Sequence, residues 1–157
     1  CLRLWRRLRR DIRLGLRLCL RPGPAIALHT CGGFATDHQA ETTHDYIQWS
    51  FPLDEPSRSV MGAPVMSELD IEEIRQSELA RQNLVKSASW FLGFLERNDH
   101  WVTNYDHNHL RITRAIKSLR LLTGDLVADE FRDKVIALAG DNLNLIDEEA
   151  RDFWNSA

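Results

Sequence analysis

Apolar side chains in the C-terminal half of the chain recur every three or four residues, the spacing of helices that bury one face. The longest run covers residues 78–96, and its predicted core positions are Leu84, Ala88, Phe91, Leu92 and Leu95. A second run, which ends at Thr123, places five apolar residues on one arc: Ile112, Ala115, Ile116, Leu119 and Leu122. We expect both runs to be core helices.

Capping signals mark the ends of these helices. The sequence Ser67-Glu68-Leu69-Asp70 has the form of a capping box, with brief packing expected from Leu69 to Ile74, and Ser77 can cap the long helix that follows. Asp106 or Asn108 can cap the second run, and Gly124 stands where a left-handed residue closes a helix.

Two further helices are predicted toward the C-terminus. Asp125 can cap a helix that ends before Gly140 and that we expect to bury Leu126, Phe131, Val135 and Leu138. Asp147 opens the last helix, whose inward residues are predicted to be Ala150, Phe153 and Trp154.

Before residue 67 the pattern predicts one short helix and a loop. Thr42 or Thr43 can cap a helix that runs to about Ser50, and Pro52 ends it. Ile47 and Phe51 can pack inward from this helix. Residues 52–66 are interrupted by prolines and a glycine and are expected to form an extended surface loop.

No window after residue 35 has the pattern of a strand. The sequence therefore predicts an all-α fold: a single compact bundle of about five or six helices, preceded by an irregular or poorly ordered basic N-terminal segment. A length of 157 residues fits one domain.

Charge divides the chain into two parts. Residues 1–35 hold eight arginines and one acidic residue, a net charge of +7, while residues 36–157 carry a net charge of −10. We therefore predict a basic Arg/Leu-rich segment over 1–35, outside the folded domain, and a helical domain over 36–157.

Three interpretations of residues 1–35 remain open. The chain starts with Cys and uses no lysine in this segment, which favours sequence that does not belong to the natural protein. A basic arm for nucleic acid or anionic lipid is the second, because clustered arginines attract phosphates, and an ordered element is the third. Arg13, Arg17 and Arg21 interrupt the apolar stretch that a signal peptide needs, so none is expected. The longest apolar runs are far short of the ~20 residues that span a bilayer, so no transmembrane helix is expected. The three cysteines show no metal-ligand or disulfide spacing.

The helix over 108–123 carries a polar stripe on a face of its own: His107, Arg111, Arg114 and Ser118 follow one another at helical spacing. Two guanidinium groups on one face need anions. They could form structural ion pairs with helix carboxylates such as Asp45, Glu72 or Asp129. They could also form an anion-binding face near the start of the helix, where the dipole is positive.

Histidines raise the questions of metal binding and of acid–base catalysis. Adjacent side chains on a helix diverge, so neither His44-Asp45 nor His107-x-His109 can chelate a metal alone. We expect no metal and no cofactor. The same geometry prevents His44 and Asp45 from acting as a catalytic pair unless a partner comes from elsewhere.

Aromatic residues at helical spacing are expected to be core residues rather than a ligand box: Tyr46, Trp49, Trp90, Trp101 and Trp154. Gln48 differs, because a buried glutamine must find hydrogen-bond partners. Asn108 and Arg111 are the partners that we predict.

Several segments together resemble the conserved region of the opioid growth factor receptor family, from about residue 40 to the end. They are His44 to Trp49, Phe51 to Leu53, Glu55 to Ser57, Ala63-Pro64, Phe91 to Gly93, Asn108 to Leu119, and Phe153-Trp154. The resemblance implies receptor activity, membrane association and, in animal members, a nuclear location. No spanning segment supports membrane insertion here, so membrane association could only be peripheral, and we expect a cytoplasmic protein.

The leading functional hypothesis is a non-enzymatic helical domain that binds a small anionic ligand or a peptide. Its candidate ligand-binding residues are His44, Asp45, Gln48, Trp49, Asn108, His109, Arg111 and Arg114. One alternative is an enzyme that uses His44 or His109 as general acid or base, with Arg111 holding an anionic substrate. Another is a structural interaction module. Nucleic acid is an expected partner only if residues 1–35 are a genuine basic arm.

Overall fold

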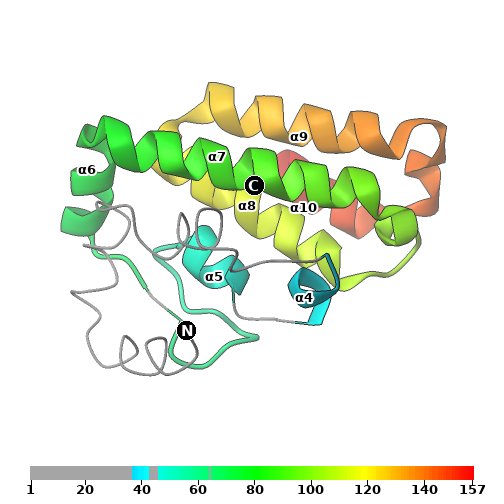
Figure 1. Cartoon of the computed structure of the whole chain (residues 1–157), viewed down its shortest axis with the longest axis horizontal. Helices are drawn as coiled ribbons and strands as arrows, with labels where there is room; N and C mark the ends of the chain where they lie inside the picture. The colour runs from blue at the N-terminus through cyan, green and yellow to red at the C-terminus, as the bar shows by residue number, and fades with distance from the viewer. Residues whose placement is uncertain (1–36, 43–45, 64) are drawn as a thin grey trace. The chain divides into compact units, whose positions relative to one another are not determined.

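The computed structural model describes residues 37–42, 46–63 and 65–157, and its regular structure is helical (Figure 1). The predicted all-α class is confirmed. The chain divides into two compact units, residues 1–83 and 84–157, and each is considered by itself. The basic segment 1–35 lies outside the described residues.

The first unit begins with two short helices, α4 (Asp37–Thr42) and α5 (Tyr46–Ser50). The sequence pattern did not predict α4, and Thr42 ends that helix instead of capping the next one. Thr43, the other predicted cap, lies outside the described residues. As predicted, Ile47 and Phe51 are buried, and Tyr46 is buried with them.

Residues 52–63, 65 and 66 lie in the predicted irregular connection, but both of its ends are buried. Leu53 and Val65 form an isolated parallel bridge, and the Met66 N–H donates to the Leu53 carbonyl oxygen at 2.9 Å. Leu53 and Met66 are almost completely shielded from solvent, so the connection is an anchored loop.

Helix α6 (Glu68–Gln76) starts with the predicted capping box. Ser67 Oγ accepts from the Asp70 N–H at 3.3 Å, and Asp70 Oδ2 accepts from the Ser67 N–H at 2.9 Å. The helix buries Ile71 and Ile74, whereas Leu69, predicted to pack, is 82% exposed because it lies on the opposite side.

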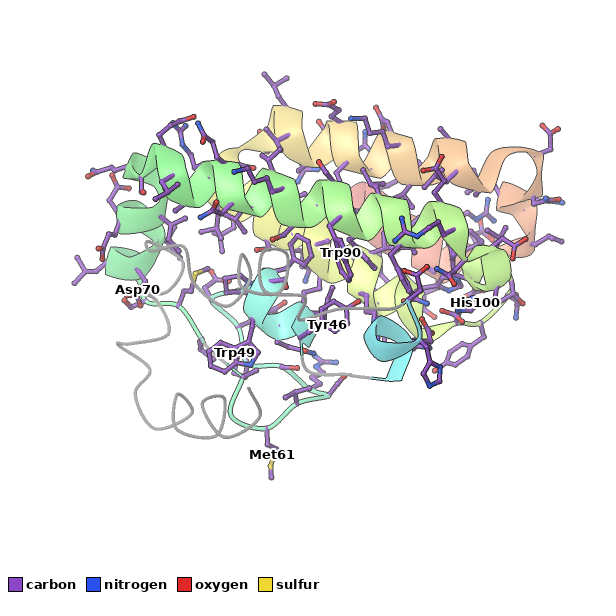
Figure 2. All side chains as sticks on the ribbon, in the orientation of Figure 1. Tyr46, Trp49, Met61, Asp70, Trp90 and His100 are labelled. Carbon is purple, nitrogen blue, oxygen red and sulfur yellow. The ribbon has the colours of Figure 1, made fainter. Side chains whose placement is uncertain are left out.

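Helix α7 (Glu78–Arg97) follows directly, and the Ala80 N–H donates to Ser77 Oγ at 3.3 Å, the cap that the sequence predicts. Its C-terminal two thirds belong to the second unit and bury Leu84, Ala88, Phe91 and Leu95 as expected. Phe94 is buried as well, and Leu92 is only half-buried. The ring of Phe94 stacks between Phe91 at 6.1 Å and Trp90 at 6.2 Å; Trp90 is labelled in Figure 2.

The second unit continues with the 3-10 helix η1 (Asp99–Trp101), α8 (His107–Thr123), α9 (Asp125–Ala139), the 3-10 helix η2 (Gly140–Leu145) and α10 (Glu148–Ser156). Helix α8 packs against both α9 and α10, which are the yellow-to-red helices of Figure 1. Its predicted apolar arc is confirmed, since all five residues are at most 1% exposed.

Turn chemistry separates α8 from α9. Gly124 has φ of +103°, a value that side-chain-bearing residues rarely adopt, and its N–H donates to the Leu119 carbonyl oxygen at 3.1 Å. Gly124 is also the N-cap of α9, so Asp125, predicted to be the cap, is the first residue of the helix itself.

Three residues of the C-terminal helices that were predicted to be buried are exposed, so these predictions are wrong. Leu126 is 87% exposed, Leu138 is 37% exposed and Phe153 is 48% exposed. Helix α9 instead buries Ala128 and Ala139 beside Phe131 and Val135, so its inward face is shifted toward small residues. In α10 only Trp154 is fully buried, and Ala150 is half-buried.

Candidate functional site

The N-terminal turn of α8 gathers the polar residues that the sequence singles out. Asp106 caps the helix, and its Oδ1 accepts from the Asn108 N–H at 2.7 Å. The Asn108 side chain is fully buried, and its Oδ1 accepts from Arg111 Nη1 at 3.0 Å. The predicted residues Asn108 and Arg111 are therefore in direct contact, and this contact fixes one edge of the guanidinium group.

Two of the four residues in the predicted polar stripe of α8 are buried. Arg111 is 5% exposed and Ser118 is completely buried, while Arg114 is half-buried and His107 is exposed. An arginine keeps its charge even in an apolar environment, because the guanidinium group does not lose its proton in proteins. This face of α8 therefore holds positive charge inside the fold, one turn from the positive end of the helix dipole.

His109, one of the predicted ligand-binding residues, is buried among aromatic side chains. Its Nε2 donates to the Trp101 carbonyl oxygen at 2.8 Å, which requires the proton on Nε2, because a carbonyl can only accept. The imidazole also meets the Trp154 ring edge-on, with centroids 5.8 Å apart, and it is 5% exposed.

The same cluster joins α7, η1, α8 and α10. Trp154 of α10 donates from Nε1 to the His109 carbonyl oxygen at 3.1 Å, and Trp101 of η1 donates from Nε1 to the Leu95 carbonyl oxygen at 3.0 Å. The two indole rings lie 6.4 Å apart. His109 thus fixes η1 and α10 to α8.

One carboxylate proposed as a structural partner of the stripe pairs with other arginines. Asp129 Oδ1 accepts from Arg120 Nη2 at 2.8 Å and from Arg132 Nη1 at 3.0 Å. The hydrogen bond from Arg120 lowers the pKa of Asp129, and the bond to Asp129 raises the pKa of Arg120. Arg120 Nη1 also donates to Asp125 Oδ1 at 3.0 Å, so this network links α8 to α9.

Gln48 belongs to the first unit and is 6% exposed, as expected for a glutamine that needs partners. Its Nε2 lies 3.5 Å from Ser57 Oγ, a residue that the helical pattern did not single out. The sequence feature that could have pointed to Ser57 was its position in the family-like segment Glu55 to Ser57. The pairing of Gln48 with Asn108 or Arg111 stays a prediction.

The other predicted site residues of the first unit carry less information. Trp49 is half-buried, and both His44 and Asp45 lie outside the described residues. Glu72, another proposed partner of the arginines, accepts from Gln76 Nε2 at 2.7 Å. Within residues 37–42, 46–63 and 65–157, no three histidine, cysteine or acidic side chains gather in a way that could hold a metal ion.

Fold and site together define an all-helical domain with a partly buried polar stripe on one helix that carries two arginines. In the part of the chain that the structure describes, no helix has the length and apolar character needed to cross a bilayer. Residues 32–149 match the family model of the opioid growth factor receptor conserved region. The chain belongs to this family.

Mammalian relatives show the same relationship. The chain is 28% identical over 121 residues to the opioid growth factor receptor of Rattus norvegicus, a match that covers 65% of the chain and 21% of the relative. It is 34% identical over 97 residues to that of Mus musculus, covering 50% and 15%, and 32% identical over 114 residues to that of Homo sapiens, covering 61% and 16%. The chain thus spans about a fifth or less of these proteins. No solved structure matches the chain.

Proposed function

We propose that this chain is a non-enzymatic binding domain, and that the polar stripe of α8 forms an anion-binding face for a small ligand or a peptide carboxylate. The relatives named above are receptors by name, and a receptor acts by binding. This supports a binding role at the level of class. The ligands of those much longer proteins are not carried over to this chain.

The observation that carries the proposal is the buried guanidinium group of Arg111. The hydrogen bond from Arg111 Nη1 to Asn108 Oδ1 orients this guanidinium group near the start of the helix. Carboxylates and phosphates match the fork of donors on a guanidinium group, and these charge-assisted bonds are stronger than bonds between neutral groups. Arg114, one turn further along the stripe, adds a second positive charge.

His109 favours this binding role over the enzyme alternative. A general base needs a lone pair that the substrate can reach. With the proton on Nε2, the lone pair of His109 is on Nδ1, in a ring that is 5% exposed and packs against Trp154. His44, the other candidate acid or base, lies outside the described residues, so an activity that depends on it stays a prediction. The cytoplasmic location also stays a prediction, and so does the peripheral membrane association.

A structural interaction module is the third candidate. It predicts an exposed apolar patch and arginines that form ion pairs within the fold. Arg120 and Arg132 pair in this way with Asp129. Exposed apolar residues lie on α9 at Leu126 and Leu138 and on α10 at Phe153. This candidate therefore stays an alternative to the anion-binding domain.

Isothermal titration and thermal-shift measurements with phosphate, nucleotides and acidic peptides test the proposal. At least one of these anions should bind the wild type and raise its melting temperature, and Arg114→Gln should weaken the effect. Lys117→Gln is the matched control, because it removes one positive charge from an exposed position of the same helix. Equal responses from both variants would mean that only diffuse charge is involved.

A further inference from the structure

The loop between α5 and α6 is closed at its base. The Leu53–Val65 bridge and the hydrogen bond from the Met66 N–H to the Leu53 carbonyl oxygen join its two ends. Leu53 and Met66 are 5% and 4% exposed, so both ends are anchored in the interior.

Bonds inside the loop fix its path. Ser57 Oγ accepts from the N–H groups of Ser59 at 3.3 Å and Val60 at 3.2 Å. Gly62 turns the chain with φ of +77°, and among the described residues beyond its two chain neighbours no atom lies within 4 Å of the position that a Cβ would occupy there. The glycine is therefore needed for its backbone conformation and not for space.

Met61 lies at the tip of this loop, next to Gly62, and its side chain is 98% exposed (Figure 2). The chain has only one other methionine, Met66, five residues away and 4% exposed. The closing bonds of the loop come from backbone groups and from Ser57. The Met61 side chain is thus fully accessible, and none of the bonds described above depends on it.

We propose that Met61 is an oxidation site, at which hydrogen peroxide converts the thioether to the sulfoxide without disturbing the fold. The sulfur lone pair attacks one peroxide oxygen and forms the S–O bond while the O–O bond breaks. Sulfur loses two electrons, and the leaving hydroxide takes up a proton to become water. Methionine sulfoxide reductases reverse the change, so the site can return to its original state.

Oxidation changes the chemistry of the loop tip. Residues 60–66 contain no charged side chain, and Met61 is their most exposed apolar group. A sulfoxide is polar, so the reaction removes the main apolar feature of this surface. The same reaction at Met66 would place a polar group in the interior and destabilise the protein.

Two single-methionine variants of the full chain, with thiols blocked by N-ethylmaleimide, test the proposal. Met66→Leu retains only Met61, and Met61→Leu retains only Met66. Peroxide oxidation of each is followed by mass spectrometry in native buffer and in concentrated guanidinium chloride. We expect similar rates in both solvents for Met61, and at least about tenfold slowing in native buffer for Met66, because a buried sulfur reacts only when the fold opens.

The oxidised Met66→Leu variant should keep its melting temperature within about 2 °C and should elute earlier from a hydrophobic-interaction column, with reductase restoring the original elution. Protection of Met61 comparable to that of Met66 would overturn the proposal. A melting temperature that falls by many degrees, or an unchanged elution, would do the same.

Discussion

Replacement of Trp154 should show how far the C-terminal helix stabilises the domain. Its side chain is completely buried, lies against His109 and Trp101, and donates a hydrogen bond to the His109 carbonyl oxygen. Truncation of a buried tryptophan to alanine costs roughly 3–5 kcal/mol, because it removes apolar contacts and leaves a cavity. Trp154→Ala should therefore lower the free energy of unfolding by this amount.

Trp154→Phe separates packing from hydrogen bonding. Phenylalanine retains an aromatic ring but has no indole N–H, and a lost hydrogen bond of this kind costs about 1 kcal/mol. The His109 carbonyl oxygen still accepts from Thr113 Oγ1 at 3.0 Å, so it is not stranded. We expect Trp154→Phe to cost clearly less than Trp154→Ala.

Urea unfolding followed by far-ultraviolet circular dichroism measures these differences. The comparison holds when the slope of the unfolding free energy against urea concentration is the same for wild type and variants. Phe153→Ala is the matched control, since the neighbouring ring is 48% exposed and its removal should cost about 1 kcal/mol or less. If Phe153→Ala cost as much as Trp154→Ala, or if Trp154→Ala cost less than about 1 kcal/mol, the described packing of α10 would be wrong.

Three further predictions concern other elements. Ser67→Ala removes the side-chain cap of α6 and should cost about 1 kcal/mol in urea unfolding; no loss would contradict the capping box with Asp70. Asp129 has a lowered folded-state pKa, so its stabilising effect is full above its unfolded pKa of about 3.9 and is lost as the pH falls through the folded value. Wild type should therefore lose more stability than Asp129→Asn between about pH 5 and pH 3. If Gln48 bonds Arg111 as the sequence predicts, Gln48→Leu and Arg111→Met should show non-additive stability losses in a double-mutant cycle, whereas additive losses would refute that pairing.

Local signals in the sequence were sufficient to place most of the helices. The capping box at Ser67, the cap at Ser77 and the glycine at 124 depend on neighbouring backbone groups, which the sequence contains directly. The predicted helices correspond to α5 through α10. Helix α4 was missed because its sequence, Asp-His-Gln-Ala-Glu-Thr, has no apolar stripe.

Burial was harder to predict where small residues form the contact. In α9, leucine is more apolar than alanine, so the pattern favoured Leu126 and Leu138 over Ala128 and Ala139. The close approach of α8 and α9 selects the smaller side chains instead. Such a choice depends on the distance between helices, which a single sequence does not encode locally.

The candidate site likewise contains one contact that the sequence predicts and one that it does not. Asn108 and Arg111 are three residues apart on one helix, so their contact follows from helical spacing. The role of His109 depends on Trp101 and Trp154, and the second of these lies 45 residues away in the chain. Only the folded structure brings them together.

Titration of the Arg111→Ala/Arg114→Ala double variant decides whether the stripe of α8 binds an anion. Circular dichroism should first confirm that this variant is folded, with Arg114→Gln as the milder substitute if it is not. A phosphate, nucleotide or acidic peptide should bind the wild type, the double variant should lose this binding, and Lys117→Gln should retain it. If no anion stabilises the wild type more than the folded double variant, the stripe is not a binding site.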